Sequence, residues 1–406
     1  MSSRSVVLGL LVVFAGTVPV HGQSALTYQQ ALTIARERAP RVAIARARID
    51  EARGRLTGAQ VRFRDNPTLD ALAGPRWLET GVITDFDIGV GQLYELGGRR
   101  AARINAAEAG IARETATANA STRQVVRDVA VSFVRTLRSQ TRLEVLRSVE
   151  SLAKEALDTA ELRYRAGDVA ILDVNLARIA LARASSQTRS AEAERAAEIG
   201  ELRVLLAWTD PIDPLIVGDF RDRIQDAAAV QETSLNERPE IQRIGAEIAE
   251  ARADVRLGQG LKMPDLGWNV RAGRDEGNPV ALAGFSLVVP LFNKGQEQVA
   301  TGLARERRAG LEQVAVGNEL NLRARAARST FQLRLAAIDP LEREVLPGLE
   351  ENERLARRSF EAGELSFPDL LVIRRELVDG RLQYVDALAD AAVASIEWQA
   401  AAGVLR

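Results

Sequence analysis

The chain of 406 residues consists of two similar halves. The stretch "YRAGDVAILDV" at 164–174 corresponds to "FEAGELSFPDL" at 360–370; each has an aromatic residue, an Ala-Gly pair, an acid, and an Asp nine places after the aromatic. Pro40 likewise corresponds to Pro239, and the offset between the halves changes only from 199 to 196 positions. An internal repeat of this kind overrides the two or three globular domains that the length alone would predict.

Each half contains the same four elements in the same order. We predict repeats at 23–210 and 211–406, each a helix, a β-hairpin, a long helix and a shorter helix. In the first repeat these elements are expected at 26–60, about 67–95, about 100–165 and 172–208, and in the second at 227–261, about 264–291, about 296–361 and 368–405. The hairpin segments alternate apolar and polar residues with a period of two, whereas the long segments show coiled-coil spacing.

The helix lengths exclude a compact domain. At about 1.5 Å per residue, a helix at 100–165 spans roughly 100 Å and each shorter helix roughly 50 Å. A compact domain of this size is about half as wide as the long helix. Two shorter helices placed end to end match one long helix, so the halves are expected to form an elongated layer of parallel rods.

The hairpins present a separate problem, because four strands cannot close a barrel. An open sheet leaves unpaired backbone groups at its edges, which a bilayer does not tolerate. The sheet is therefore either a cap in water or part of a barrel to which several chains contribute. The strands are about ten residues long, which suits a tilted transmembrane strand.

The N-terminal segment resembles a signal peptide. Arg4 precedes an apolar run at 6–20 that is too short to span a membrane as a helix, and we place cleavage after Gly22. We therefore expect residues 1–22 to be removed and the mature chain to be exported.

The composition argues against several function classes. The chain has no Cys, and its one His, His21, lies in the predicted signal peptide. The mature chain thus lacks the commonest general base and the commonest metal ligand. The formal net charge of −1 does not favour a nucleic-acid partner. We predict no enzyme activity, no cofactor and no resident metal.

Several segments together resemble an outer membrane efflux protein of the TolC family. They are "LTYQQALTIARERAPRVAIARARIDEARGRL" (26–56), "NPTL" (66–69), "QLYELGGRRAARINAAEA" (92–109), "RPEIQRIGAEIAEARADV" (238–255), "VVPLFNKG" (288–295) and the two stretches quoted above. They cover nearly all of the mature chain in the family's order. "ELGGRR" at 95–100 further resembles the cation-efflux, CzcC-like branch.

The resemblance implies a mainly α fold with a small β part. Each chain would supply a third of a trimeric outer-membrane β-barrel and a third of a periplasmic α-helical tunnel. The homotrimer would sit in outer-membrane lipid of a Gram-negative bacterium. It would act as a passive duct for small solutes, metal cations or drugs, with a periplasmic adaptor and an inner-membrane pump as partners.

In the family, the two turns between the long and shorter helices form the periplasmic tip of the tunnel, with its gate and adaptor-docking surface. The resemblance places these functions on Tyr164, Arg165, Gly167, Asp168, Asp173, Phe360, Glu361, Gly363, Glu364 and Asp369. Gly167 and Gly363 suit helix C-termini that need a left-handed residue. Asp173 and Asp369 suit the first turns of the returning helices, where a carboxylate can cap free N–H groups.

The tip departs from well-studied gates of the family. Leu365 and Val372 stand where such gates carry an arginine and a second aspartate. We hypothesise that Arg165 and Glu361, which occupy matching places in the two repeats, attract one another instead.

Two other interpretations remain open. One is the outer-membrane duct of a type I protein secretion system. The other is an exported coiled-coil protein with a structural or binding role and a small β cap.

Overall fold

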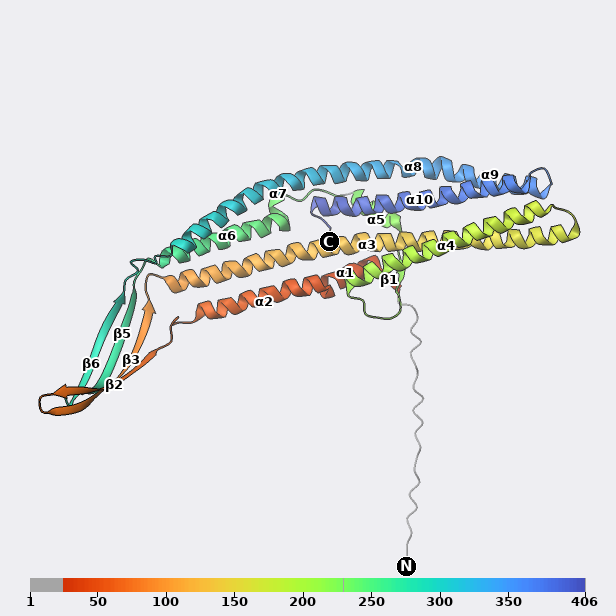
Figure 1. Ribbon diagram of the computed structural model, residues 1–406. Helices are drawn as coiled ribbons and strands as arrows, with labels where there is room; N and C mark the ends of the chain where they lie inside the picture. The colour runs from red at the N-terminus through yellow and green to blue at the C-terminus, as the bar shows by residue number, and fades with distance from the viewer. Residues whose placement is uncertain (1–24, 229, 406) are drawn as a thin grey trace, which may run out of the picture.

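The computed structural model describes residues 25–228 and 230–405, and the protein is a long, slightly bent rod (Figure 1). A four-stranded sheet forms one end, and the two turns between long and shorter helices form the other. The predicted signal peptide lies outside the described residues.

The elements of the first repeat follow the predicted order, with one addition at the start. They are β1 (Ala25–Thr27), α1 (Tyr28–Arg38), α2 (Pro40–Gln60), β2 (Thr68–Leu78), β3 (Gly81–Glu95), α3 (Arg99–Ala166) and α4 (Ile171–Leu206).

The second repeat contains the same series and a more broken long helix. Its elements are β4 (Leu215–Val217), α5 (Phe220–Ala228), a 3-10 turn (Leu235–Glu237), α6 (Pro239–Gly260), β5 (Asp265–Asp275), β6 (Asn278–Val288), α7 (Gln296–Ala336), α8 (Ile338–Pro340), a π-helical segment (Leu341–Val345), α9 (Leu346–Glu361) and α10 (Phe367–Ala402). The predicted fold class is confirmed: the chain is mainly helical, with a small β part and two tandem repeats.

The prediction of one continuous helix at the start of each repeat was wrong. Ala39 separates α1 from α2, and Arg238 precedes α6; both residues have extended backbone, with ψ of 133° and 134°. Each is followed by a proline, which clashes with a helical residue before it and is tolerated only in the first turn of the next helix. In the second repeat the helix expected at 227–261 is thereby reduced to α6.

The sheet joins the two repeats. Its strand order is β2-β3-β5-β6 and all its pairs are antiparallel. The central pair, β3 with β5, comes from different repeats and aligns Val90 with Val270 and Ile88 with Ala272. Within the described residues β2 and β6 each have one strand neighbour, so each leaves one edge unpaired.

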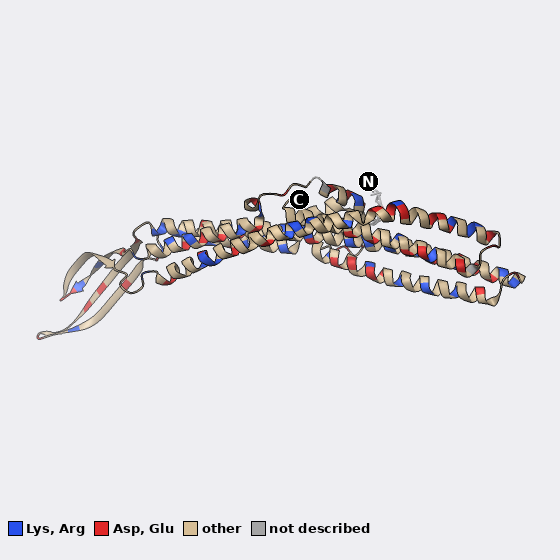
Figure 2. Cartoon of the chain, turned by 90° about the horizontal axis from the view of Figure 1, so that it is seen from above, with Lys and Arg blue, Asp and Glu red and all other residues tan. Residues whose placement is uncertain are grey.

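The helices form a layer in which the shorter helices lie end to end. α6 lies against α3 and α7 in the half near the sheet, and α10 lies against α3 and α9 in the other half. The two meet where the Arg238 guanidinium donates to the Ala401 carbonyl and the Thr233 N–H donates to the Ala402 carbonyl at 2.9 Å. Acidic and basic residues are interspersed along the long helices (Figure 2).

The largest apolar core lies at the middle of the rod, where a belt crosses the long helices. The belt comprises α1, α5 and the parallel pair β1–β4, and sequence analysis did not find α5 or the two short strands. Phe133 of α3 is 2% exposed and meets the Tyr28 ring edge-on at 5.5 Å between centroids. Ile216 and Ile396 complete this core.

Candidate functional site

The two tip turns have the same backbone design. α3 ends at Gly167, whose φ is +85°; the Gly167 N–H donates to the Tyr164 carbonyl at 3.0 Å and the Asp168 N–H donates to the Arg163 carbonyl at 2.9 Å. This is the double hydrogen bond of a glycine-terminated helix, which satisfies the last free carbonyls and needs a left-handed residue.

The second turn repeats this pattern. Gly363 has φ of +77°, and its N–H donates to the Phe360 carbonyl at 3.1 Å. The Glu364 N–H donates to the Ser359 carbonyl at 2.8 Å. The shared Ala-Gly-acid sequence therefore has a local physical cause: both turns end a long helix in the same way.

The returning helices begin differently from one another. Asp173 lies in the first turn of α4, but no side chain caps that helix among the described residues. α10 is capped by Ser366, whose hydroxyl oxygen accepts from the Asp369 N–H at 3.3 Å and whose hydroxyl donates to the Asp369 carboxylate at 2.5 Å. Asp173 and Asp369 lie in the first turns of these helices as predicted, but the prediction that their side chains cap the helices was wrong. A Ser three places before an Asp was the available signal for the second cap.

The tip residues are brought together in one chain through an aromatic contact. The Arg163 guanidinium of α3 lies 5.5 Å from the centre of the Phe360 ring of α9, so the two turns are neighbours. Arg165 pairs with Glu161 at 4.0 Å and Glu361 pairs with Arg357 at 3.1 Å, each within its own helix. Within one chain the structure thus pairs neither Arg165 nor Glu361 with the other.

The tip is open to solvent and rich in acids. Tyr164 is 46% exposed, and both glycines lie on the surface. Asp168, Glu361, Glu364 and Asp369 are exposed, whereas Asp173 is half-buried. The tip is therefore a solvent-exposed surface that carries four exposed carboxylates.

At the other end, one face of the sheet is covered with exposed apolar side chains. Residues paired across antiparallel strands point to the same face. The exposed large apolar side chains on this face are Leu69, Trp77, Val82, Phe86, Ile88, Val90, Tyr94, Leu266, Val270, Phe285 and Leu287. A contiguous apolar surface of this kind marks contact with lipid or with another protein.

The opposite face is polar on the two central strands. Asp85, Asp87, Asn269 and Arg271 lie there with several glycines, whereas leucine and valine occupy parts of the edge strands. Arg76 of β2 donates to Asp85 at 2.5 Å and to Glu276 at 3.0 Å, and also pairs with Asp275. One arginine of the first hairpin thereby connects carboxylates of both hairpins.

A third group, at the junction of sheet and helices, was not predicted. Arg99 is 5% exposed and pairs with Asp265 at the start of β5. Arg100 donates to the Gln60 carbonyl at 2.8 Å, and Arg103 donates to the Ala59 carbonyl at 3.2 Å while pairing with Glu95. The arginines that follow the two glycines of "ELGGRR" thus bind strand ends and the last carbonyls of α2. The closely spaced arginines at 99, 100 and 103 were the available signal in the sequence for such a group.

Neither a spanning helix nor a metal cluster is found in the described ranges. Within residues 25–228 and 230–405, none of the helices contains an apolar stretch long enough to cross a membrane. Within the same ranges, no three His, Cys, Asp or Glu side chains are grouped to hold a metal ion.

Comparison with known proteins identifies the family. The model of the outer membrane efflux protein family matches residues 31–207 and, a second time, residues 230–404. The chain belongs to the outer membrane efflux protein family. It is thus an outer-membrane component of an efflux system, and its family is one of channels.

Two relatives are similar over most of this efflux protein. The cobalt-zinc-cadmium resistance protein CzcC of Cupriavidus metallidurans is 28% identical over 381 residues, which are 91% of this chain and 89% of the relative. The pyoverdine export outer membrane protein OpmQ of Pseudomonas aeruginosa is 25% identical over 347 residues, which are 79% and 71%.

Solved structures show the same fold. CusC, described as forming a transmembrane channel, superposes with a TM-score of 0.74 at 16% identity, covering 93% of this chain and 92% of CusC. The Campylobacter jejuni outer membrane channel CmeC superposes with a TM-score of 0.72 at 14% identity, covering 93% and 85%. The predicted resemblance is confirmed.

Proposed function

We propose that three copies of this efflux protein form an outer-membrane duct with a complete ring of strands, and that this duct exports metal cations. The observation that supports the trimer is the sheet, with its exposed apolar face and its two unpaired edges, on β2 and β6. Lipid provides no hydrogen bonds for such edges, so β6 of one copy must pair with β2 of the next until the ring closes. Three copies supply twelve strands.

Closure assigns the two faces of the sheet. The apolar face contacts lipid, and the polar face of the central strands lines the duct. Away from the helix junction, four aspartates and two arginines lie on the lining face, so acids exceed bases by two per chain. These residues are Asp70, Arg76, Asp85, Asp87, Arg271 and Asp275. An acidic lining favours cations, in keeping with the similarity to a cobalt-zinc-cadmium resistance protein.

The tip forms the periplasmic mouth, which docks an adaptor that links the duct to an inner-membrane pump. Its exposed acids and the surfaces around Gly167 and Gly363 are the contact candidates. The duct is passive and the chain catalyses no reaction. At the closed mouth, Arg165 of one copy attracts Glu361 of a neighbour. To do so, each side chain must first break the exposed ion pair within its own helix, which contributes about 0.2–1 kcal/mol.

Disulfide mapping tests the ring directly, because the chain has no cysteine of its own. Ala73→Cys on β2 is combined with Ala281→Cys or Ala283→Cys on β6, and oxidised membranes are run on denaturing gels. A ladder ending at a covalent trimer is expected for at least one pair. Ala73→Cys with Ala272→Cys, on the interior strand β5, is the matched control and should give monomers. Monomers from both edge pairs would overturn the ring.

Cargo is tested by current through the purified duct in a planar bilayer. A salt gradient should give a reversal potential that shows preference for cations. This preference should be smaller in a variant with Asn in place of four aspartates, Asp70, Asp85, Asp87 and Asp275. Glu232→Gln, an exposed carboxylate of the linker before α6, is the control.

A deletion strain complemented with the wild type should regain tolerance to cobalt, zinc and cadmium. Restored drug tolerance or protein secretion without metal tolerance would contradict the cargo.

The mouth is tested by charge exchange. Arg165→Glu should make the resting duct leak, and adding Glu361→Arg should close it again. Equal leakage by the single and double variants would exclude this pair as the latch.

A further inference from the structure

A row of ion pairs connects α3 and α10 at the middle of the rod. Arg127 donates to both oxygens of Glu397, at 2.6 and 2.8 Å, and Arg138 donates to Asp386 at 2.8 Å. Arg135 lies on α3 between these two arginines. In the described part of the chain it makes no hydrogen bond or ion pair.

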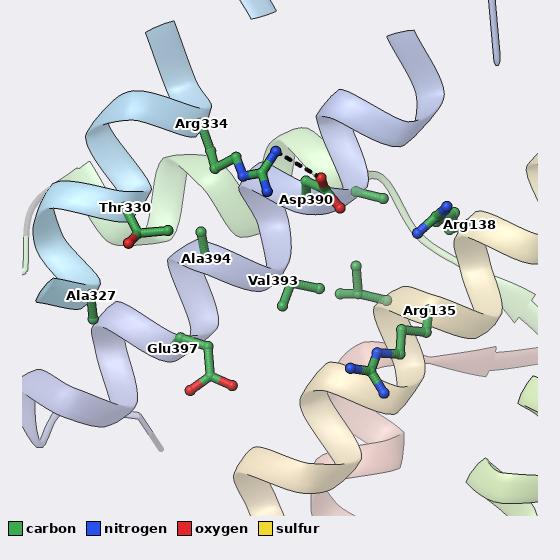
Figure 3. Close-up of a pocket in the computed structure, with 11 residues that line it drawn as sticks. Arg135, Arg138, Ala327, Thr330, Arg334, Asp390, Val393, Ala394 and Glu397 are labelled. Atoms are coloured by element: carbon green, nitrogen blue, oxygen red, sulfur yellow. Dashed lines mark ion pairs between the residues drawn. The ribbon is translucent and has the colours of Figure 1, made fainter. Parts of the chain in front are cut away.

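The reason is visible in the side chains that face Arg135. α10 presents Val393 there, and the nearby carboxylate of Asp390 pairs instead with Arg334 of α7 at 3.1 Å (Figure 3). The row therefore lacks a carboxylate on α10 that pairs with Arg135. The exposed guanidinium of Arg135 acts on the carboxyl of Glu198 in α4 only through its charge, without a hydrogen bond or ion pair between them.

A cleft of about 440 Å³ opens at this point between α3, α7 and α10. Val393 and Ala394 form an apolar floor, while Arg135 and Arg138 extend from α3 toward α10 (Figure 3). The carboxylates of Asp390 and Glu397 also line the cleft, and they pair with Arg334 and Arg127. Thr330 of α7 adds a hydroxyl group to the wall. The volume is within the range of small-molecule sites, which typically combine an apolar surface with a few polar groups.

We propose that this cleft binds a small organic anion, a carboxylate carried on a compact apolar body. The planar guanidinium of Arg135 matches a carboxylate through two parallel hydrogen bonds. Arg138 adds a guanidinium whose Nε–H is already donated to Asp386 and whose other N–H groups remain available. The apolar body covers Val393 and Ala394. Because the carboxylates of Asp390 and Glu397 already have arginine partners, an amine of the same shape would meet the positive charge of Arg135.

The cleft opens on the side of α10 that faces away from the belt. The Ser395 hydroxyl donates to the Arg223 carbonyl of α5 at 2.5 Å, and Val393, two residues earlier, points roughly 200° around the helix. In a trimer of the kind proposed above with the belt on the outside, the cleft opens into the duct. Binding itself does not depend on the trimer.

The test is calorimetric titration of the purified full chain in a non-ionic detergent, with benzoate as the probe and benzylamine as its cationic counterpart. Benzoate should bind, and Arg135→Ala should weaken binding about tenfold or more, as expected for the loss of a charge-assisted pair. Arg183→Ala, which removes an exposed arginine of α4 outside the cleft, should leave binding unchanged.

Two further variants separate binding from misfolding. Val393→Phe fills the floor without changing charge and should block benzoate. Asp390→Asn frees Arg334 from its partner and should tighten benzoate binding, which a folding defect would not do. The proposal is overturned if wild type fails to bind benzoate, if benzylamine binds equally well, or if Arg135→Ala and Asp390→Asn leave the affinity unchanged.

Discussion

The two long helices cover the same length of the molecule in different ways. α3 is continuous for 68 residues, whereas the second repeat has α7, α8, a π-helical segment and α9 over the same distance. At the repeat offset of 196, Glu144 of α3 corresponds to Pro340, the last residue of α8 before the π-helical segment. A proline removes one helical hydrogen bond and crowds the preceding turn, and a π segment accommodates that change.

The belt supports the interrupted helix. Arg221 of α5 donates to Glu342 in the π segment at 2.8 Å and to the Tyr384 hydroxyl of α10 at 2.6 Å. Comparable support for α3 at Glu144 is not needed, because its backbone ladder is intact. The difference teaches that one architecture can be built twice with one stiff long helix and one that bends at a proline.

The junctions with the sheet differ as well. In the first repeat, Arg99 and Arg103 bind Asp265 and Glu95. In the second, the segment at 290–296 holds no arginine, and Gly295 packs against the backbone of Gly258 instead. Charge holds the first junction and close backbone contact holds the second.

The two repeats should differ most in how much stability is lost when the buried ion pair of Arg99 and Asp265 is removed. Arg99→Ala leaves Asp265 without its partner and should lower the free energy of unfolding by about 3–5 kcal/mol. Gln296→Ala, the matching position of the second repeat, removes two exposed hydrogen bonds and should cost about 1 kcal/mol. Urea titration of the detergent-solubilised protein measures both. Equal losses would remove the distinction between the junctions.

Adding a proline to the continuous helix should lower the stability much more than removing the proline from the interrupted one changes it. Glu144→Pro introduces a proline at an exposed interior position of α3 and should cost about 3 kcal/mol or more. Pro340→Ala should change stability by less than about 1 kcal/mol, because the π segment already accommodates the altered ladder. Thermal unfolding followed by circular dichroism compares them. A large loss from Pro340→Ala would show that the interruption itself is required for stability.

Replacing the glycine at the start of α3 by alanine should lower the free energy of unfolding by about 1–3 kcal/mol less than the same change at the start of α7. Gly98 and Gly295 have φ of +73° and +74°, so alanine costs roughly 1–2 kcal/mol at either site. A Cβ at Gly98 meets no atom of the described residues within 4 Å, whereas at Gly295 it would overlap the Gly258 carbonyl oxygen and force α6 to move. The unfolding free energies of the two alanine variants measure the difference; a larger loss for Gly98→Ala would contradict it.

The smallest effect concerns a carboxyl that only the first repeat has. Burial raises the pKa of Glu198 in α4 above its usual range, partly opposed by Arg135, and one carboxyl oxygen has no partner among the described residues. At the repeat offset its counterpart is Ala394. Because the pKa is raised in the folded state, the stability from this group is present at acidic pH and lost as pH rises through the folded pKa.

Glu198→Gln should therefore stabilise the protein at neutral pH by about 0.5–1 kcal/mol and make little difference near pH 4. The gain is below the usual cost of a buried unpaired group because the side chain is partly exposed. Glu201→Gln, an exposed neighbour, is the control. A pH-independent effect of Glu198→Gln would show that titration is not its cause.

The sequence by itself determined the repeat, the long helices, the hairpins and the tip glycines. These are local properties: a period of two or a coiled-coil spacing, a glycine that permits positive φ, and a length that no compact domain accommodates. Pro40 and Pro239 also carried a local signal for a helix break, but the surrounding apolar pattern concealed it.

Only the tertiary structure decided the belt, the junction and the cleft. β1 and β4 are three residues each and form a pair only because Ala25 and Leu215, far apart in the chain, meet across α3. Whether Asp390 neutralises Arg135 or Arg334 depends on how α7 approaches α10. Such choices depend on distances between helices, which the spacing of residues within one helix does not encode.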